Sequence, residues 1–196
     1  MEDEISRSIR IGLQQHYFTE LGRFVAIFAL TEAMLKKVLQ ATAKVDDSVS
    51  LAIFSGTRSD AVSSFIRRCF EARGERLPEK LAILLERFAL FSNLRNDVLH
   101  HGIDFSTTPP TSSNKLGVLN PRAVRETPIE RDDLYDASHD LGVIMLGLTA
   151  FLGRDDPRML DVTSRHPWRY KPTPPKNKGR SRHPKKRARR AQPRRP

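Results

Sequence analysis

The strongest constraint on folding is the uneven distribution of charge along the 196-residue chain. Residues 165–196 contain 14 Lys and Arg residues and no Asp or Glu, whereas residues 1–164 contain 20 basic and 23 acidic residues. The basic segment also holds seven of the 13 prolines and only two aromatic residues. Such a segment buries too little apolar surface to offset the entropy lost on ordering. We therefore predict one folded domain over residues 1–154 and a disordered Pro/Arg/Lys-rich tail over residues 155–196.

The composition of the tail favours a polyanionic partner, nucleic acid above all, because Lys and Arg neutralise backbone phosphates. The run 185–190 would also pass as a nuclear import signal. The alternative is a tail that only keeps the protein soluble, but fourteen like charges exceed that need. The basic residues predicted to bind nucleic acid are Lys176, Lys178, Arg180, Arg182, Lys185, Lys186, Arg187, Arg189 and Arg190.

The composition excludes several protein classes. One cysteine, Cys69, cannot form a disulfide scaffold or a Cys-rich zinc site. The longest apolar run, residues 24–30, is too short to span a membrane, and the acidic N-terminus does not resemble a secretory signal. We expect a cytoplasmic protein that does not contact membranes.

The histidines outside the predicted third helix show no ligand spacing that indicates a metal site. His139 lies among the acids of the last predicted helix, and acids near a helix N-terminus need no metal to explain them. These acids are Asp132, Asp136 and Asp140. We therefore expect neither a metal nor a cofactor.

Apolar residues recur at helical spacing in four segments, which are residues 5–43, 57–74, 78–102 and 127–152. Gly74 and Gly102 suit the left-handed ends of the second and third segments. Thr127 and Glu130 form a capping-box pattern at the start of the fourth. Residues 103–126 are rich in Pro, Ser and Thr, which is typical of a loop. The pattern predicts an all-α, up-and-down bundle of four to five helices, with a long loop before the last helix.

One charged residue stands on the apolar stripe of the third helix. At 100° per residue, Arg95 falls among the apolar positions Leu84, Phe88 and Phe91. A guanidinium there is unfavourable unless it is paired or used. Asn96 and His100 are four residues apart and therefore share the adjacent face.

These residue types suit phosphodiester cleavage without a metal. Arginine offers a fork of donors that matches a phosphate, and histidine exchanges protons near neutral pH. An RNA 2′-hydroxyl could attack the adjacent phosphate, with His100 moving protons and Arg95 holding the oxyanion. The alternative is structural: a snorkelling or salt-bridged Arg95, and a histidine that interacts with the helix dipole.

The stretch Arg95-Asn96-Asp97-Val98-Leu99-His100 resembles the Arg-x4–6-His motif of HEPN domains. These are helical bundles, many of which are metal-independent endoribonucleases. The family often has a polar residue after the arginine, as Asn96 is here, and small residues after the histidine, where this chain has His101 before Gly102. An earlier Glu-x3-Lys element of some members is similar to Glu32-Ala33-Met34-Leu35-Lys36.

The resemblance implies a homodimer in which two Arg/His motifs share one cleft. It also implies that Arg95, His100 and Asn96 are catalytic, with Glu32 and His101 as possible supporting residues. An Arg95–Glu32 contact could orient the arginine, although the Glu32–Lys36 pair at i,i+4 is the alternative that we prefer.

The sequence thus favours a metal-independent endoribonuclease of HEPN type with a role in defence or stress by family analogy, and a neutralising or regulatory protein as a further partner. The alternative is a non-catalytic helical dimer that binds nucleic acid, a nucleotide or a partner protein, with the tail as a polyanion-binding arm. A third reading is a scaffold whose tail docks on a polyanion.

Overall fold

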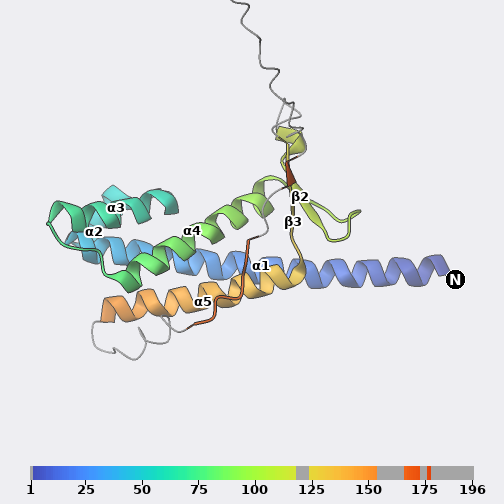
Figure 1. The fold of residues 1–196 in the computed structure, drawn as a ribbon, viewed down its shortest axis with the longest axis horizontal. Helices are drawn as coiled ribbons and strands as arrows, with labels where there is room; N and C mark the ends of the chain where they lie inside the picture. Colours follow the sequence, from blue (N-terminus) through green and yellow to red (C-terminus); the bar gives the residue numbers. More distant parts are fainter. Residues whose placement is uncertain (1, 118–123, 154–165, 173–175, 178–196) are drawn as a thin grey trace, which may run out of the picture.

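The computed structural model describes residues 2–117, 124–153, 166–172 and 176–177 (Figure 1). These residues form a helical bundle with a small antiparallel sheet at one end, so the predicted all-α bundle is confirmed. The helices are α1 (Glu2–Ala43), α2 (Asp47–Phe54), α3 (Ser59–Ala72), α4 (Glu79–His100) and α5 (Arg131–Gly153).

The long helix α1 is the common packing partner of the bundle, with α5 and α3 along its sides. Thr31 of α1 donates to the carbonyl of Leu141 in α5 at 3.4 Å, and Phe28 of α1 stacks on Phe88 of α4 at 5.1 Å between ring centroids. α1, α3 and α5 run in one direction, and α4 runs in the opposite one (Figure 1). The short α2, which the sequence did not predict, lies between α1 and α3 and lets the chain return before α3 begins. Asp46 caps it by accepting the backbone N–H of Val49 at 2.9 Å.

The apolar positions predicted on the third and fourth helical segments form the core. The largest fully buried side chains come from α1, α3, α4 and α5 and, in one case, from the turn that precedes α5: Phe24, Leu35, Leu39, Ile66, Leu81, Leu84, Leu85, Phe88, Phe91, Ile129, Leu134 and Leu141. Leu99, although apolar, is 43% exposed near the end of α4, whereas its neighbour Val98 is buried in the core.

Helix α4 ends as predicted, because Gly102 has a φ of +67° that favours glycine. The predicted loop that follows contains the strands β1 (Ile103–Asp104), β2 (Thr111–Ser113) and β3 (Arg125–Pro128), and β4 (Lys176–Asn177) completes the sheet. All pairings are antiparallel, in the order β1-β2-β3-β4.

The predicted capping box is wrong, since Thr127 and Pro128 pair with β2 and α5 begins at Arg131. Instead, the backbone N–H of Glu130 donates to the carboxylate of Asp133 at 2.9 Å. The helix begins three residues later than predicted because Thr127 pairs with β2, and the local sequence pattern does not reveal this non-local pairing.

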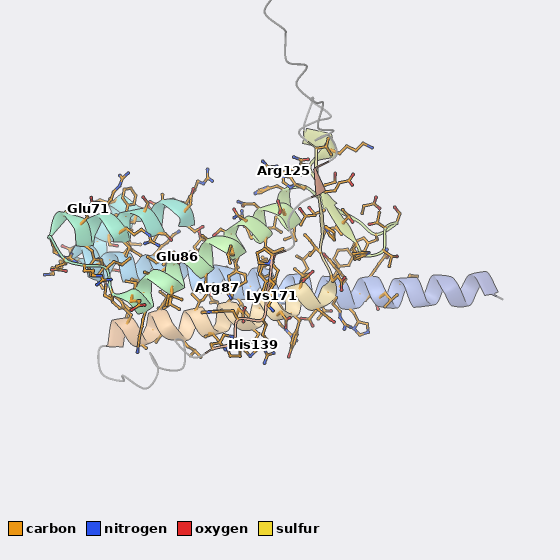
Figure 2. All side chains as sticks on the ribbon, in the orientation of Figure 1. Glu71, Glu86, Arg87, Arg125, His139 and Lys171 are labelled. Carbon is orange, nitrogen blue, oxygen red and sulfur yellow. The ribbon has the colours of Figure 1, made fainter. Side chains whose placement is uncertain are left out.

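Residues 166–172 lie within the predicted disordered tail, and this part of that prediction is wrong. The segment crosses α5 towards the sheet, beside Arg87 and His139 (Figure 2). Tyr170 is only 7% exposed and packs against Phe91 at 5.5 Å between ring centroids. The guanidinium of Arg87 lies 4.6 Å from the ring centroid of Trp168. These two aromatic residues supply apolar contacts that the average composition of the tail concealed.

Asp140 of α5 fixes this segment by hydrogen bonds. Its buried carboxylate accepts His166 Nε2 at 2.9 Å and the backbone N–H groups of Arg169 and Tyr170 at 3.0 Å each. A buried carboxylate is unfavourable unless donors replace its water. The docked segment supplies those donors. The rest of the predicted tail, apart from β4, lies outside the described residues.

Candidate functional site

Three of the predicted site residues come together at the C-terminal end of α4. Arg95 Nη1 lies 3.1 Å from Asn96 Oδ1, to which it donates, and 3.3 Å from His100 Nε2. Arg95 and Asn96 are half-buried, whereas His100 is exposed. Both partners of Arg95 therefore belong to α4, the helix that carries the arginine.

The contact between Arg95 and His100 has a defined chemical meaning. A guanidinium has donors and no acceptor. At this contact, His100 Nε2 is placed to accept a hydrogen bond from the Arg95 guanidinium. A neutral imidazole with an available lone pair can act as a general base, and the adjacent guanidinium can hold an anion.

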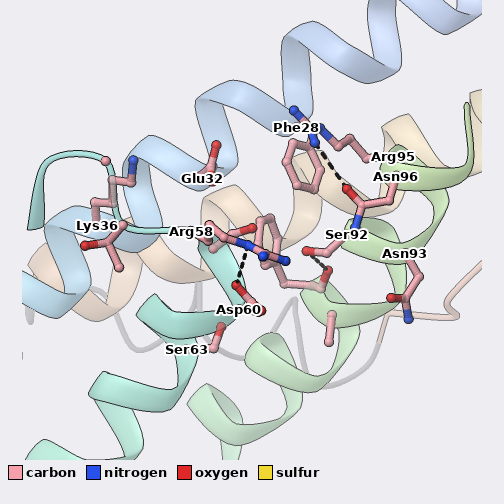
Figure 3. Close-up of a pocket in the computed structure, with 15 residues that line it drawn as sticks. Phe28, Glu32, Lys36, Arg58, Asp60, Ser63, Ser92, Asn93, Arg95 and Asn96 are labelled. Atoms are coloured by element: carbon pink, nitrogen blue, oxygen red, sulfur yellow. Dashed lines mark hydrogen bonds and ion pairs between the residues drawn. The ribbon is translucent and has the colours of Figure 1, made fainter. Parts of the chain in front are cut away.

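Arg95 and Asn96 also line a cavity of about 540 Å³ between α1, α3 and α4 (Figure 3). Phe28 and Phe88 form an apolar part of its wall. The other lining residues are mostly polar: Glu32, Lys36, Gly56, Thr57, Arg58, Ser59, Asp60, Ser63, Ala89, Ser92 and Asn93. Three cations and two carboxylates thus face the cavity, which is a suitable surface for a phosphate-bearing ligand.

Glu32 lines the same cavity as Arg95 (Figure 3). Its location, though not its ion pairing, is therefore compatible with the predicted supporting role. Among the described residues, it forms neither the Arg95 ion pair nor the preferred Lys36 pair. Its carboxylate is therefore available to a ligand or to a rearranged arginine.

Sequence reasoning did not single out two cations of this cavity. Lys36 was considered only as part of the Glu-x3-Lys element. In the structure it lines the cavity one turn after Glu32. Arg58 precedes α3 and forms an ion pair with Asp60 at 3.5 Å. No local pattern could have linked Arg58 to Arg95, since only the packing of α3 beside α1 and α4 brings them to one cavity.

His101 belongs to a different side of the helix end. Its Nδ1 lies 3.3 Å from a carboxylate oxygen of Asp97, and it lines a separate cavity beside the sheet. Burial raises the pKa of the Asp97 carboxyl, while His101 and Arg125 oppose that shift. Ser112 of β2 donates to the backbone carbonyl of Asp97 at 2.8 Å. Ser112 therefore ties the helix end to the sheet, and His101 pairs with Asp97 rather than with the Arg95–His100 pair.

Of the nine basic residues predicted to bind nucleic acid, Lys176 alone lies in the described part of the chain. It is in β4, paired with Glu126 of β3. The other eight lie outside the described residues, so their predicted role stays a prediction.

No protein-family model matches the sequence, and neither curated proteins nor solved structures yield a match. Within the part of the chain that the structure describes, no helix is both long and apolar enough to cross a membrane.

Proposed function

We propose that the protein is a metal-independent endoribonuclease of HEPN type, with Arg95 and His100 as its catalytic residues. The observation that carries the proposal is the 3.3 Å contact between the Arg95 guanidinium and His100 Nε2 at the end of α4. This contact joins an anion-binding donor to a proton acceptor five residues apart on one helix. Asn96, which accepts from the same guanidinium nitrogen, is proposed to orient Arg95.

In the proposed reaction, the 2′-oxygen of a ribose attacks the adjacent phosphorus while His100 Nε2 takes the 2′-hydroxyl proton. Arg95 turns from His100 to the phosphate and stabilises the charge on its non-bridging oxygens. The bond to the 5′-oxygen breaks, and this oxygen takes up a proton as it leaves. The products are a 2′,3′-cyclic phosphate and a 5′-hydroxyl, so no water or redox partner enters this step.

The reaction needs one group to accept a proton and another to donate one. Each chain supplies a single histidine beside Arg95 in the described residues, since His101 is paired with Asp97. We propose that a homodimer meets this need, with the partner subunit's His100 as the proton donor. The exposure of His100 leaves it accessible to such a partner.

The test compares four proteins on total RNA in the presence of EDTA: wild type and the variants Arg95→Ala, His100→Ala and His16→Ala. The wild type is expected to leave 2′,3′-cyclic phosphate ends. Each site variant should lose roughly 100-fold or more of the activity. His16→Ala, which changes an exposed histidine of α1, is the matched control and should cleave as the wild type does. Cleavage that survives His100→Ala would reject the catalytic assignment.

The cavity favours a second candidate function, a binding module for a phosphate-bearing ligand. Arg58 and Lys36 face this cavity, whereas His100 does not line it. This alternative predicts no cleavage by any of the four proteins, together with salt-sensitive RNA or nucleotide binding that Arg58→Ala weakens. His100→Ala should then leave binding unchanged.

A further inference from the structure

A second cluster of chemically competent side chains lies where residues 166–172 cross α5. His139, Asp140 and His166 each offer one possible ligand atom, and these atoms all lie within 4.8 Å of one another. None of the three belongs to the Arg95 site or its cavity. We propose that they form a binding site for a divalent transition metal, with Zn²⁺ as the ion that fits best.

The donor set selects the class of metal. Two imidazole nitrogens and one carboxylate oxygen suit Zn²⁺, whereas Mg²⁺ and Ca²⁺ prefer oxygen ligands alone. Three protein ligands with a fourth position for water form a known type of zinc coordination. This conclusion departs from the sequence-based expectation of no metal. The sequence showed no ligand spacing because His166 comes from a segment 26 residues beyond Asp140.

Two of the three ligand separations are near those of a zinc site, and the two histidine nitrogens, which lie within 4.8 Å of each other, would move closer on binding the ion. Ligand bonds of roughly 2.0–2.2 Å place two atoms of a tetrahedral zinc site about 3.3 Å apart. His166 Nε2 lies 2.9 Å from Asp140 Oδ1, and His139 Nδ1 lies 3.9 Å from the same oxygen. Zn²⁺ would replace the proton that now bridges His166 and Asp140.

One of the three groups has no explanation in the metal-free arrangement. His139 Nδ1 is shielded from solvent and has no hydrogen-bond partner among the described residues, although the side chain as a whole is 37% exposed. Buried polar atoms normally have a partner, and leaving one without a partner is unfavourable. A metal ion beside Asp140 would satisfy this nitrogen. Asp140 and His166, which are paired already, do not by themselves require an ion.

Surrounding residues would support the ligands. The backbone N–H groups of Arg169 and Tyr170 donate to Asp140 Oδ2 at 3.0 Å each, and Oδ1, which Arg169 also approaches at 3.2 Å, lies within 3.9 Å of both histidines. Hydrogen bonds of this kind orient the ligating carboxylates of metal sites. The His139 and His166 rings stack with 5.3 Å between centroids, and Trp168 contacts the edge of His166 at 5.1 Å. The bound ion would join α5 to the segment that carries His166.

The experiment titrates the full-length, EDTA-treated and dialysed protein with Zn²⁺ alone, followed by calorimetry and by tryptophan fluorescence. Trp168 is the only tryptophan of the chain and therefore reports on this cluster. We expect one Zn²⁺ per chain with a Kd below about 1 µM, together with a change in Trp168 emission. Excess Mg²⁺ should not compete.

The decisive variant is His139→Gln, because His139 Nδ1 has no hydrogen-bond partner among the described residues that the replacement would remove. Circular dichroism should show an unchanged fold, and the affinity for Zn²⁺ should fall more than about tenfold because one of three ligands is lost. His16→Gln, on the exposed face of α1, is the matched control and should bind as the wild type does. Binding that survives His139→Gln, or the absence of binding at 1:1 stoichiometry in the wild type, would overturn the proposal. RNA cleavage in EDTA tests a different set of residues, so the two proposals can fail separately.

Discussion

The Arg95 site and the Asp140 cluster use similar side chains in opposite ways. Asp140 is fully buried, and three donors from residues 166–170 already surround its carboxylate. His100 is exposed at the end of α4, and its one polar contact among the described residues is the guanidinium of Arg95. Hydrogen bonding around Asp140 therefore holds two parts of the fold together. At the Arg95 site, by contrast, a ligand could replace the contact between Arg95 and His100 with little loss of structure.

From this difference we expect substitutions at Asp140 to reduce stability and substitutions at the Arg95 site to affect chemistry instead. A buried charge whose partners are removed is strongly destabilising, whereas exposed polar pairs contribute little. The following predictions separate the two regions by stability measurements, carried out in EDTA so that no bound metal contributes.

The largest effect is expected for Asp140→Ala. The change leaves His166 Nε2 and the backbone N–H groups of Arg169 and Tyr170 without their acceptor. Chemical denaturation should show a loss of about 3–5 kcal/mol in the free energy of unfolding. Asp132→Ala is the control, since Asp132 is exposed and pairs only with Arg131, and it should cost less than about 1 kcal/mol. Equal losses in the two variants would contradict the assigned role of Asp140.

The next effect concerns two truncations of the C-terminal segment. A chain that ends at residue 165 loses the donors to Asp140 and the buried ring of Tyr170, and its free energy of unfolding should fall by about 2–4 kcal/mol. A chain that ends at residue 177 keeps these contacts and should unfold like the full chain. Its RNA binding should nevertheless weaken and lose much of its salt dependence. Two equally stable truncations would mean that the docked segment does not stabilise the bundle.

A smaller effect on stability is expected at the Arg95 site. Arg95→Ala and His100→Ala should each change the free energy of unfolding by less than about 1 kcal/mol, because the pair is at the surface end of α4. Thermal melts of the variants used in the cleavage assay would provide this value. A loss comparable with that of Asp140→Ala would mean that the pair is structural, and the proposed function would lose its main support.

The smallest effect is a pH dependence that involves Asp97. Burial raises the pKa of this carboxyl above its ordinary value of 3.8, so the folded state binds its proton more readily than the unfolded state. Its contribution to stability therefore falls as the pH rises from about 4 through the raised pKa. Relative to Asp97→Asn, the wild type should lose stability across that window. For Asp104 the pH dependence should have the opposite sign, because hydrogen bonds from Ser106 lower the pKa of its carboxyl. Relative to Asp104→Asn, the wild type should therefore gain stability as the pH rises through the titration of this carboxyl.

The helices were predictable from sequence because their signals are local. The apolar period of α4 and its end at Gly102 depend on neighbours along the chain, and both were found. The same reasoning placed Asn96 and His100 on the face next to that of Arg95, since a helix fixes their spacing, and the structure brings both into contact with the guanidinium. The predicted catalytic roles and the dimer stay predictions.

The missed features depend on pairs that are distant in sequence. β3 was read as a helix start because its partner β2 is not visible from Thr127 alone. Residues 166–172 were assigned to the tail because charge and proline dominate the average composition, while the buried Asp140 that attracts them lies 26 residues earlier. Arg58 lines the cavity because α3 packs beside α1 and α4, and no local sequence pattern predicts this packing.

The pairing of β4 with β3 also has a kinetic consequence for the proposed nuclease. β4 ends at Asn177, in the same sheet whose strand β2 hydrogen-bonds the C-terminal turn of α4 through Ser112 and Asp97. The basic residues after Asn177 are thus covalently anchored near the end of the helix that carries His100 (Figure 1). An RNA strand held by them would meet the Arg95–His100 pair at a high effective concentration. Binding by the basic residues and cleavage at Arg95 and His100 would then be successive steps on one bound RNA strand. A change that detaches β4 from β3 would slow turnover without altering the basic residues or the Arg95–His100 pair.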